Sequence, residues 1–211
     1  KKIKQEKLDK KNYINSLDLE NDSSITKFVN SSLSFTDKKY IPENLVNIHS
    51  DYVYDAKWNT QLIRVEANKA LQKLAKSFYE EFGKKIIVVS AYRSYEYQAW
   101  IKSRWCPDNI CAKPWYSEHQ SGLALDFFEA TSNREFLSKP NLKKYFHWLN
   151  ENAHTFGFHN TYQKGLEIDW YEIEPWHRRY VWEDFATYLK DNNITIAEFY
   201  KKRNSDLTLS K

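Results

Sequence analysis

The sequence predicts an α+β fold, in which a small and mainly antiparallel sheet is flanked by helices. Long segments with the apolar spacing of a helix are joined by short strand-like runs, and no internal repeat is present. Long helices with short strands between and after them are typical of this fold class. Apolar residues make up 41% of the 211-residue chain and aromatic residues 17%, which is enough for the core of one domain.

Residues 1–38 differ in composition from the rest of the chain. They are rich in Lys, Asn, Asp and Ser, and their scattered apolar residues follow no sustained period. We interpret them as a linker or a partly helical N-terminal tail. The domain is expected to cover residues 39–211, with ordered packing from about Tyr40, because Pro42 favours an extended chain at its entry.

The clearest helix is predicted over residues 60–82, where apolar residues recur at helical spacing and a glycine follows as a stop signal. Residues 85–91 then form a β-branched run of strand length. Ser94 is suited to cap the next helix, which should extend to about residue 105. Arg93 therefore lies at a junction between a strand and a helix.

The middle of the chain continues with a loop, a strand and a helix. Residues 106–118 contain the prolines and the Asn-Asp content of a loop. A strand is expected at residues 123–129. An amphipathic helix is expected at residues 141–156, where a glycine ends it.

The C-terminal part is predicted to hold one more strand and two helices. Residues 166–173 alternate well enough for a strand that delivers Glu174 at its end, and Pro175 disfavours helical geometry at Glu174. Helices are expected at residues 182–190 and 195–203. The second of these begins with the Thr-x-x-Glu spacing of a capping box.

Charge and hydropathy exclude two classes of partner. The net charge of +4 is a mild basic bias spread over many lysines, and no nucleic-acid module is recognisable, so no nucleic-acid partner is expected. No apolar run approaches the ~20 residues that a membrane-spanning helix needs, and there is no apolar leader. The chain holds no methionine, even at position 1, so we expect a fragment and leave open an upstream leader or anchor.

Cys106 and Cys111 are the only cysteines in the sequence. Their short spacing favours a local disulfide in an oxidising compartment, with a reduced and inert pair as the alternative. Two cysteines without nearby histidines make a poor zinc site.

The stretch from Ser117 to Asp126 places a histidine and a carboxylate on either side of a glycine. In a straight strand, His119 and Asp126 would point to opposite faces, because they are seven residues apart. A loop carrying His119, a turn at Gly122 where a positive φ costs little, and a strand carrying Asp126 would let both side chains reach one ion.

A second cluster, Glu-Pro-Trp-His at residues 174–177, can supply the missing ligand. Catalytic zinc takes three protein ligands and leaves one position for water, and His119, Asp126 and His177 meet that count. Glu174 could accept a proton from water at the metal and pass it to a leaving amine. A lone histidine is more often a surface or core residue, so the combination of both motifs carries the prediction.

These motifs, with a few residues around them, closely resemble the zinc-dependent D-alanyl-D-alanine carboxypeptidases of the VanY type, a peptidase group that includes LD-carboxypeptidases. The resemblance covers roughly residues 40–190 and leaves out the cysteine-bearing loop and the C-terminal tail. The residues that carry it are Ser117, His119, Gly122, Ala124, Asp126, Glu174, Trp176 and His177, together with Tyr40-Ile41-Pro42, the turn from Ser90 to Ser94, and Gln98.

The resemblance implies a single zinc-peptidase domain with one Zn²⁺ held by His119, Asp126 and His177. It also implies Glu174 as the general base and acid, and Arg93 as an electrophilic or substrate-binding residue. A guanidinium fork suits either a terminal carboxylate or an oxyanion, which supports Arg93 independently.

Four further residues are candidate substrate contacts: Ser117, Gln98, Trp176 and Tyr92. Ser117 and Gln98 could hydrogen-bond a peptide, or serve only as a cap or a solvent contact. Trp176 and Tyr92 could line a pocket, or belong to the core.

We therefore expect an extracytoplasmic, monomeric zinc D,D-carboxypeptidase that removes the terminal D-alanine from peptidoglycan stem peptides. An LD-carboxypeptidase or a peptidoglycan endopeptidase would use the same metal site with a different pocket. The alternative from another class is a non-catalytic zinc-containing domain that binds the cell wall, and the presence of Glu174 argues against it.

Overall fold

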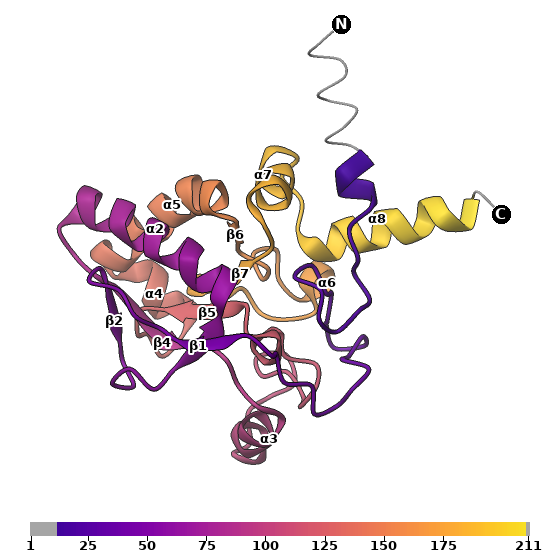
Figure 1. Cartoon of the computed structure of the whole chain (residues 1–211), viewed down its shortest axis with the longest axis horizontal. Helices are drawn as coiled ribbons and strands as arrows, with labels where there is room; N and C mark the ends of the chain where they lie inside the picture. Colours follow the sequence, from indigo (N-terminus) through magenta and orange to yellow (C-terminus); the bar gives the residue numbers. More distant parts are fainter. Residues whose placement is uncertain (1–11, 210–211) are drawn as a thin grey trace, which may run out of the picture.

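The computed structural model describes residues 12–209 and holds two sheets flanked by helices (Figure 1). The strands are β1 (Leu45–Asn47), β2 (Val53–Asp55), β3 (Leu62–Arg64), β4 (Ile86–Ser90), β5 (Ala124–Phe127), β6 (Phe158–His159) and β7 (His177–Tyr180). The α-helices are α2 (Val65–Phe82), α3 (Tyr95–Ser103), α4 (Asn133–Ser138), α5 (Pro140–Asn152), α6 (Leu166–Asp169), α7 (Glu183–Asp191) and α8 (Ile196–Leu209). Two 3₁₀ helices are η1 (Glu118–Ser121) and η2 (Ala153–Phe156).

The larger sheet has the strand order β2-β4-β5-β7-β6, and β1 pairs with β3 in a separate small sheet. All pairs are antiparallel except β2 with β4. The predicted α+β class with a mainly antiparallel sheet is therefore confirmed. In the register of β5 and β7, Asp126 lies opposite His177, so both side chains project from the same face of the sheet.

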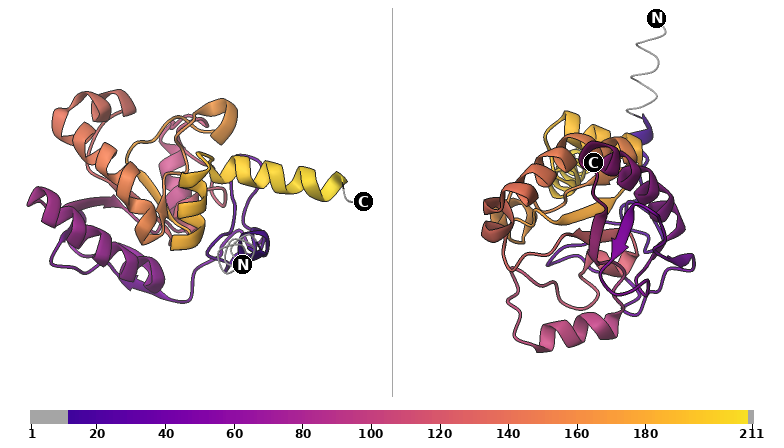
Figure 2. Two further views of the ribbon diagram at one scale, coloured as in Figure 1. Left: turned by 90° about the horizontal axis from the view of Figure 1, so that it is seen from above. Right: turned by 90° about the vertical axis from the view of Figure 1, so that its left-hand side faces the viewer.

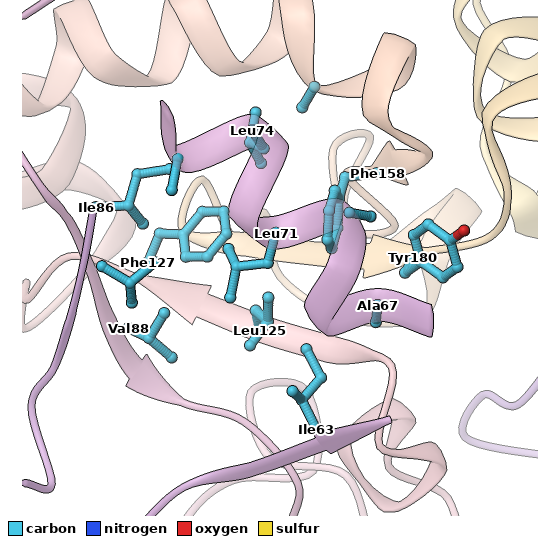
Figure 3. Packing of buried hydrophobic residues seen from close by; sticks show 14 of the residues in the cluster. Ile63, Ala67, Leu71, Leu74, Ile86, Val88, Leu125, Phe127, Phe158 and Tyr180 are labelled. Carbon is cyan, nitrogen blue, oxygen red and sulfur yellow. The ribbon is translucent and has the colours of Figure 1, made fainter. Parts of the chain in front are cut away.

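Helix α2 covers the other face of this sheet, where the main core lies (Figure 3). Buried side chains of α2 such as Leu71 pack towards Leu125 and Phe127 of β5. The helix ends at Gly83 in the left-handed conformation with φ +61°, as the sequence predicts. Because β5 turns Leu125 and Phe127 to α2, Asp126 between them projects to the opposite face.

The predicted helix over residues 60–82 is wrong at its start. Residues 62–64 form β3 and pair with β1, and the helix begins only at Val65. The backbone N–H of Arg64 donates to the carbonyl of Gly122 at 2.8 Å. This long-range pairing overrides the local helical period and brings the start of α2 beside the glycine turn.

The predicted strand over residues 166–173 is also wrong, because its first half is the short helix α6. The Asp169 carboxylate accepts hydrogen bonds from the backbone N–H groups of Gln163 and Lys164, at 3.0 and 2.6 Å. Such local side-chain bonds compete with strand pairing. Glu174 consequently lies in a loop that leads into β7, not at the end of a strand.

The segment from residue 12 to residue 38 packs against α7 and α8 (Figures 1 and 2). The buried members of this second core are Ile14, Leu17, Leu19, Phe28, Val181, Phe185, Ala186, Leu189, Ile196, Ala197 and Phe199. Buried Arg179 also donates to the carbonyls of Ile25 and Lys27, at 3.0 and 3.3 Å. The expectation that ordered packing starts near Tyr40 is therefore wrong. The sequence did not reveal this packing, because the contacts are long-range and produce no periodic pattern within the segment itself.

The division of the chain at residues 38 and 39 stays a prediction, and the part of the predicted tail before residue 12 lies outside the described residues. Within residues 12–209, no helix combines the length and the apolar character needed to cross a bilayer. The capping box of the last helix is confirmed, since Glu198 Oε2 accepts the Thr195 backbone N–H at 2.8 Å and Thr195 Oγ1 accepts the Glu198 backbone N–H at 3.3 Å. Helix α4 is an element that the sequence did not predict.

Candidate active site

Three side chains that can bind a metal ion meet on the face of the larger sheet opposite to α2. One donor atom each of His119, Asp126 and His177 lies within 4.8 Å of the other two. His119 Nε2 is 3.2 Å from Asp126 Oδ2, and His177 Nδ1 is 3.1 Å from Asp126 Oδ1. All three side chains are largely buried, and this mixed nitrogen and oxygen set can hold a zinc-type ion.

The local sequence explains how His119 and Asp126 converge. Ser117 caps η1 by accepting the His119 backbone N–H, and Gly122 then reverses the chain at φ +67° before β5 presents Asp126. A Cβ at Gly122 would lie 2.8 Å from a Leu45 methyl group, and the substituted residue would have to adopt a φ that strains residues other than glycine, so the turn favours glycine. The predicted arrangement of loop, glycine turn and strand is confirmed.

Hydrogen bonds behind the two imidazoles orient their free nitrogen atoms. His119 Nδ1 is 2.7 Å from the Ala91 carbonyl, which fixes the proton on Nδ1 and leaves the Nε2 lone pair directed at Asp126. His177 Nε2 is 2.9 Å from Glu118 Oε2, which leaves Nδ1 directed at the Asp126 carboxylate. Partners of this kind set the tautomer of metal-binding histidines.

Glu118 is a functional candidate that the sequence analysis missed. Its side chain is only 1% exposed, accepts a hydrogen bond from Thr161 Oγ1 at 2.8 Å, and lies 3.9 Å from Arg179 Nη1. His177 and Arg179 hold the pKa of Glu118 below its ordinary value, against the effect of burial. The one sequence signal is the position of a carboxylate directly before a candidate ligand.

Glu174 lies in the cavity wall, with Oε2 at 3.7 Å from His177 Nδ1. Its backbone N–H donates to the Tyr162 carbonyl at 2.9 Å, which fixes the loop before β7. Burial raises the pKa of Glu174 to about 7, and the negative charge of Asp126 adds to this effect. A carboxyl group with such a pKa can both take up and release a proton near neutral pH.

The charges of the three convergent side chains are strongly coupled. Burial alone would lower the pKa of His177, but hydrogen bonds with Asp126 and Glu118 raise it to about 9. Burial and Arg93 lower the pKa of His119 to about 4. The pKa of Asp126 is lowered by its histidine neighbours and Arg93, although burial opposes this.

Arg93 lies between β4 and α3, at the predicted junction, and lines the same cavity. Its Nη2 atom is 2.6 Å from Asp126 Oδ2, and its Nε donates to Ser90 Oγ at 2.9 Å. Gln98 Oε1 is 3.5 Å from Nη1 of the same guanidinium. The cation is thus held by several partners at the edge of the metal-binding cluster.

The cavity around these side chains has a volume of about 210 Å³. Its lining consists of Arg93, Ile101, Ile110, Cys111, Ala112, Ser117, His119, Asp126, Tyr162, Tyr171, Glu174, Trp176 and His177. Of the four candidate substrate contacts, Ser117 and Trp176 are in this lining, whereas Gln98 and Tyr92 are not. Gln98 donates to the Ala112 carbonyl at 2.7 Å and so supports the wall from behind.

The α+β scaffold, the His-Asp-His donor set and the adjacent carboxylate define a zinc peptidase. The chain belongs to the VanY D-alanyl-D-alanine carboxypeptidase family, whose model matches residues 60–183. It is 33% identical over 196 residues to the putative carboxypeptidase YodJ of Bacillus subtilis. This match covers 87% of this chain and 70% of YodJ.

Solved structures are similar over most of the chain. The LD-carboxypeptidase LdcB has a TM-score of 0.72 and 32% identity, over 86% of this chain and 87% of LdcB. A second similar structure is that of a mutant of the D,D-pentapeptidase VanY from a VanB-type resistance cassette, in complex with Zn(II). It has a TM-score of 0.61 and 27% identity, over 82% of this chain and 97% of the VanY chain. The same TM-score and identity are found for VanYB in complex with D-alanine-D-alanine.

The cysteine-bearing loop contributes one wall of the cavity, and its two cysteines form a disulfide. We expect replacement of Cys106 and Cys111 by serine to raise KM several-fold without loss of zinc, because Ile110 would lose its fixed position. Opening so short a ring should also cost about 2 kcal/mol of stability. Steady-state kinetics, metal analysis and thermal denaturation check this, and an unchanged KM would contradict the role of the wall.

Proposed function

We propose that this chain is a zinc-dependent D,D-carboxypeptidase that removes the terminal D-alanine from peptidoglycan stem peptides. The observation that carries this proposal is the convergence of His119, Asp126 and His177 in one cavity with Glu174, in a chain of the VanY family. The position of the buried Glu174 carboxyl beside the three convergent side chains suits a general base and acid, which supports an enzyme over a non-catalytic binding domain.

The residues present fit a single zinc ion. His119 Nε2 and His177 Nδ1 both face the Asp126 carboxylate, and the opposite nitrogen of each ring is engaged by a hydrogen-bond acceptor, so that Nδ1 of His177 can act as a donor atom once it has lost its proton. We assign these three side chains as the zinc ligands. Zinc, when bound, acts as a Lewis acid that polarises a carbonyl and acidifies water.

The chain's own residues supply the proton transfers and the electrostatic stabilisation. Glu174 takes the proton of the attacking water and then protonates the amine that leaves, which is the D-alanine nitrogen. Arg93 directs its guanidinium into the cavity, where it can stabilise the negative charge of the scissile carbonyl oxygen or bind the terminal carboxylate. Ser117 and Trp176, which line the cavity, are proposed substrate contacts.

The size of the cavity suits a short peptide end. Drug-sized ligands occupy pockets of roughly 300–1,000 Å³, so a cavity of about 210 Å³ favours a small terminal residue such as alanine. The apolar side chains of Ile101 and Ile110 in its lining offer contacts for a methyl group.

An LD-carboxypeptidase is the second candidate function, because LdcB resembles this chain with a TM-score of 0.72. The two activities differ in the stem peptide that they shorten. Incubation with pentapeptide and with tetrapeptide stems, followed by mass spectrometry, separates them: loss of one alanine from the pentapeptide alone supports the D,D activity. Loss from the tetrapeptide alone supports the L,D activity, and cleavage further in indicates an endopeptidase. Zinc binding without hydrolysis of either peptide would contradict the enzymatic proposal.

We propose an extracytoplasmic location, because peptidoglycan stem peptides are exposed outside the cytoplasm. The disulfide between Cys106 and Cys111 supports this location, since such bonds persist mainly in oxidising compartments.

Zinc binding by this site is expected to release protons. The pKa of His177 is raised to about 9 in the metal-free protein, so the ring is protonated below that pH and must lose its Nδ1 proton to become a ligand. The apparent zinc affinity should therefore rise about tenfold per pH unit between about pH 7 and pH 9. Calorimetric titration in two buffers of different protonation enthalpy measures the released proton, and equal heats in both buffers would contradict the assignment.

A further inference from the structure

A second cavity, of about 430 Å³, lies between α5, β6 and the end of α7, which lie close together in Figure 1. It is separate from the candidate active site, because the two cavities share no lining residue. Its lining is largely polar and includes Asn150, His159 and Arg178. The function derived above uses none of these three side chains.

Arg178 is the unusual member of this lining. In the register of the sheet it lies opposite Leu125, so it projects to the helix-covered face, and it is only 1% exposed. Its Nη1 donates to the carbonyls of Pro175 and His177, at 3.1 and 2.7 Å, and its Nη2 donates to Asn150 Oδ1 at 2.8 Å. All of these acceptors are neutral.

The guanidinium of Arg178 therefore has no counter-charge from the chain. Among the side chains of residues 12–205, which the structure describes, no carboxylate oxygen lies within 4.0 Å of it. Glu151 is the single acidic residue in the lining, and it is exposed and paired with Lys190 at 2.8 Å. Neighbouring Arg179, on the opposite face, does have a carboxylate, that of Glu118. A buried cation whose hydrogen-bond partners are all neutral is costly, which favours an anion from outside the chain.

We propose that this cavity binds a small carboxylate monoanion, which Arg178 and Asn150 recognise. A guanidinium fork matches a planar carboxylate, and the Asn150 amide can donate to the same group once its oxygen is engaged. Apolar surface from Leu149 and Phe158 in the lining can accept a short alkyl end.

The charge balance of the cavity favours one negative charge over two. Burial lowers the pKa of His159 to about 3, so its ring is neutral at physiological pH. Lys190 is already paired with Glu151. Arg178 is thus left as the one uncompensated cation among these groups, and it neutralises a single negative charge. The site does not depend on the reaction proposed for the first cavity.

Thermal denaturation of the zinc-loaded protein, with acetate, D-alanine or inorganic phosphate at constant ionic strength, tests this proposal. Acetate should raise the Tm of the wild type, by about 5 °C at a hundredfold excess over its Kd. The decisive variant is Asn150→Asp, which places a carboxylate beside the guanidinium without a change in size. It should have a higher Tm without acetate and show no further increase with it.

Two further variants show whether acetate acts at this cavity or at the candidate active site. Arg93→Gln should retain the acetate effect, because Arg93 belongs to the other cavity, and Arg178→Met should lose it. D-alanine should act like acetate if the carboxylate is what is recognised. The proposal is overturned if wild type and Asn150→Asp respond equally to acetate, if the effect disappears in Arg93→Gln, or if phosphate stabilises more than the carboxylates do.

Discussion

Replacement of Glu174 by alanine is expected to lower kcat for stem-peptide hydrolysis by about 10³-fold. Glu174 lies at the cavity wall with Oε2 3.7 Å from the Nδ1 atom of His177, and burial raises its pKa to about 7. No other described carboxyl group in the cavity lining is free for proton transfer, because Asp126 is engaged by His119, His177 and Arg93. The variant should still bind one zinc ion, since Glu174 is not among the proposed ligands.

Steady-state kinetics and metal analysis of the purified variant measure both parts of this prediction. Glu167→Ala is a suitable control, because it removes an exposed carboxylate of α6 outside the cavity lining and should leave kcat unchanged. Glu174→Gln, which keeps the size of the side chain but cannot accept the proton, should resemble the alanine variant. If Glu174→Ala kept more than a tenth of the wild-type kcat, the assignment of the base would be wrong.

Removal of the Glu118 carboxylate is expected to have the second largest effect. Glu118→Ala should weaken zinc binding by about 10–100-fold, because the His177 ring loses the acceptor that directs its Nδ1 lone pair. The same change removes the one charged partner that Arg179 has among the described side chains, so the free energy of unfolding should fall by about 3 kcal/mol.

Competition with a chelating dye and urea denaturation measure these two effects. Glu118→Gln keeps a hydrogen-bond acceptor and the side-chain volume, so it should fold while still showing weaker zinc binding. Thr161→Val removes the other hydrogen bond to the same carboxylate and should cost only about 1 kcal/mol. Wild-type zinc affinity in both Glu118 variants would contradict a role in orienting His177.

His119 and Asp126 could be predicted from the sequence because the turn between them is local, and His177 because it belongs to a short motif of its own, Glu-Pro-Trp-His. Gly122 and the residues on either side of it determine the turn that joins His119 to Asp126. The register of β5 and β7 then brings His177 opposite Asp126. Apart from its position directly before His119, no local pattern indicates a role for Glu118, since its partners Thr161 and Arg179 lie far away in the chain and its charge suggests an exposed residue.

The errors in the predicted fold have the same physical origin. Residues 62–64 have a helical period but pair with β1, and residues 166–169 have an alternating pattern but form a turn of helix around the Asp169 carboxylate. The packing of residues 12–38 onto α7 and α8 depends on contacts across most of the chain. Segments whose structure follows from their own periodicity, such as the helix from Val65 to Phe82 and strand β5, agree with the prediction.

The hydrogen bonds from Arg179 to the carbonyls of Ile25 and Lys27 span more than 150 residues. Through Glu118, the same guanidinium is connected to His177, so the candidate metal site is linked to the N-terminal segment of the described residues. Contacts between such distant residues form late, after most of the loop-closure entropy has been lost. We therefore expect the hydrogen-bond network behind His177 to be complete only when both ends of the described fold have come together.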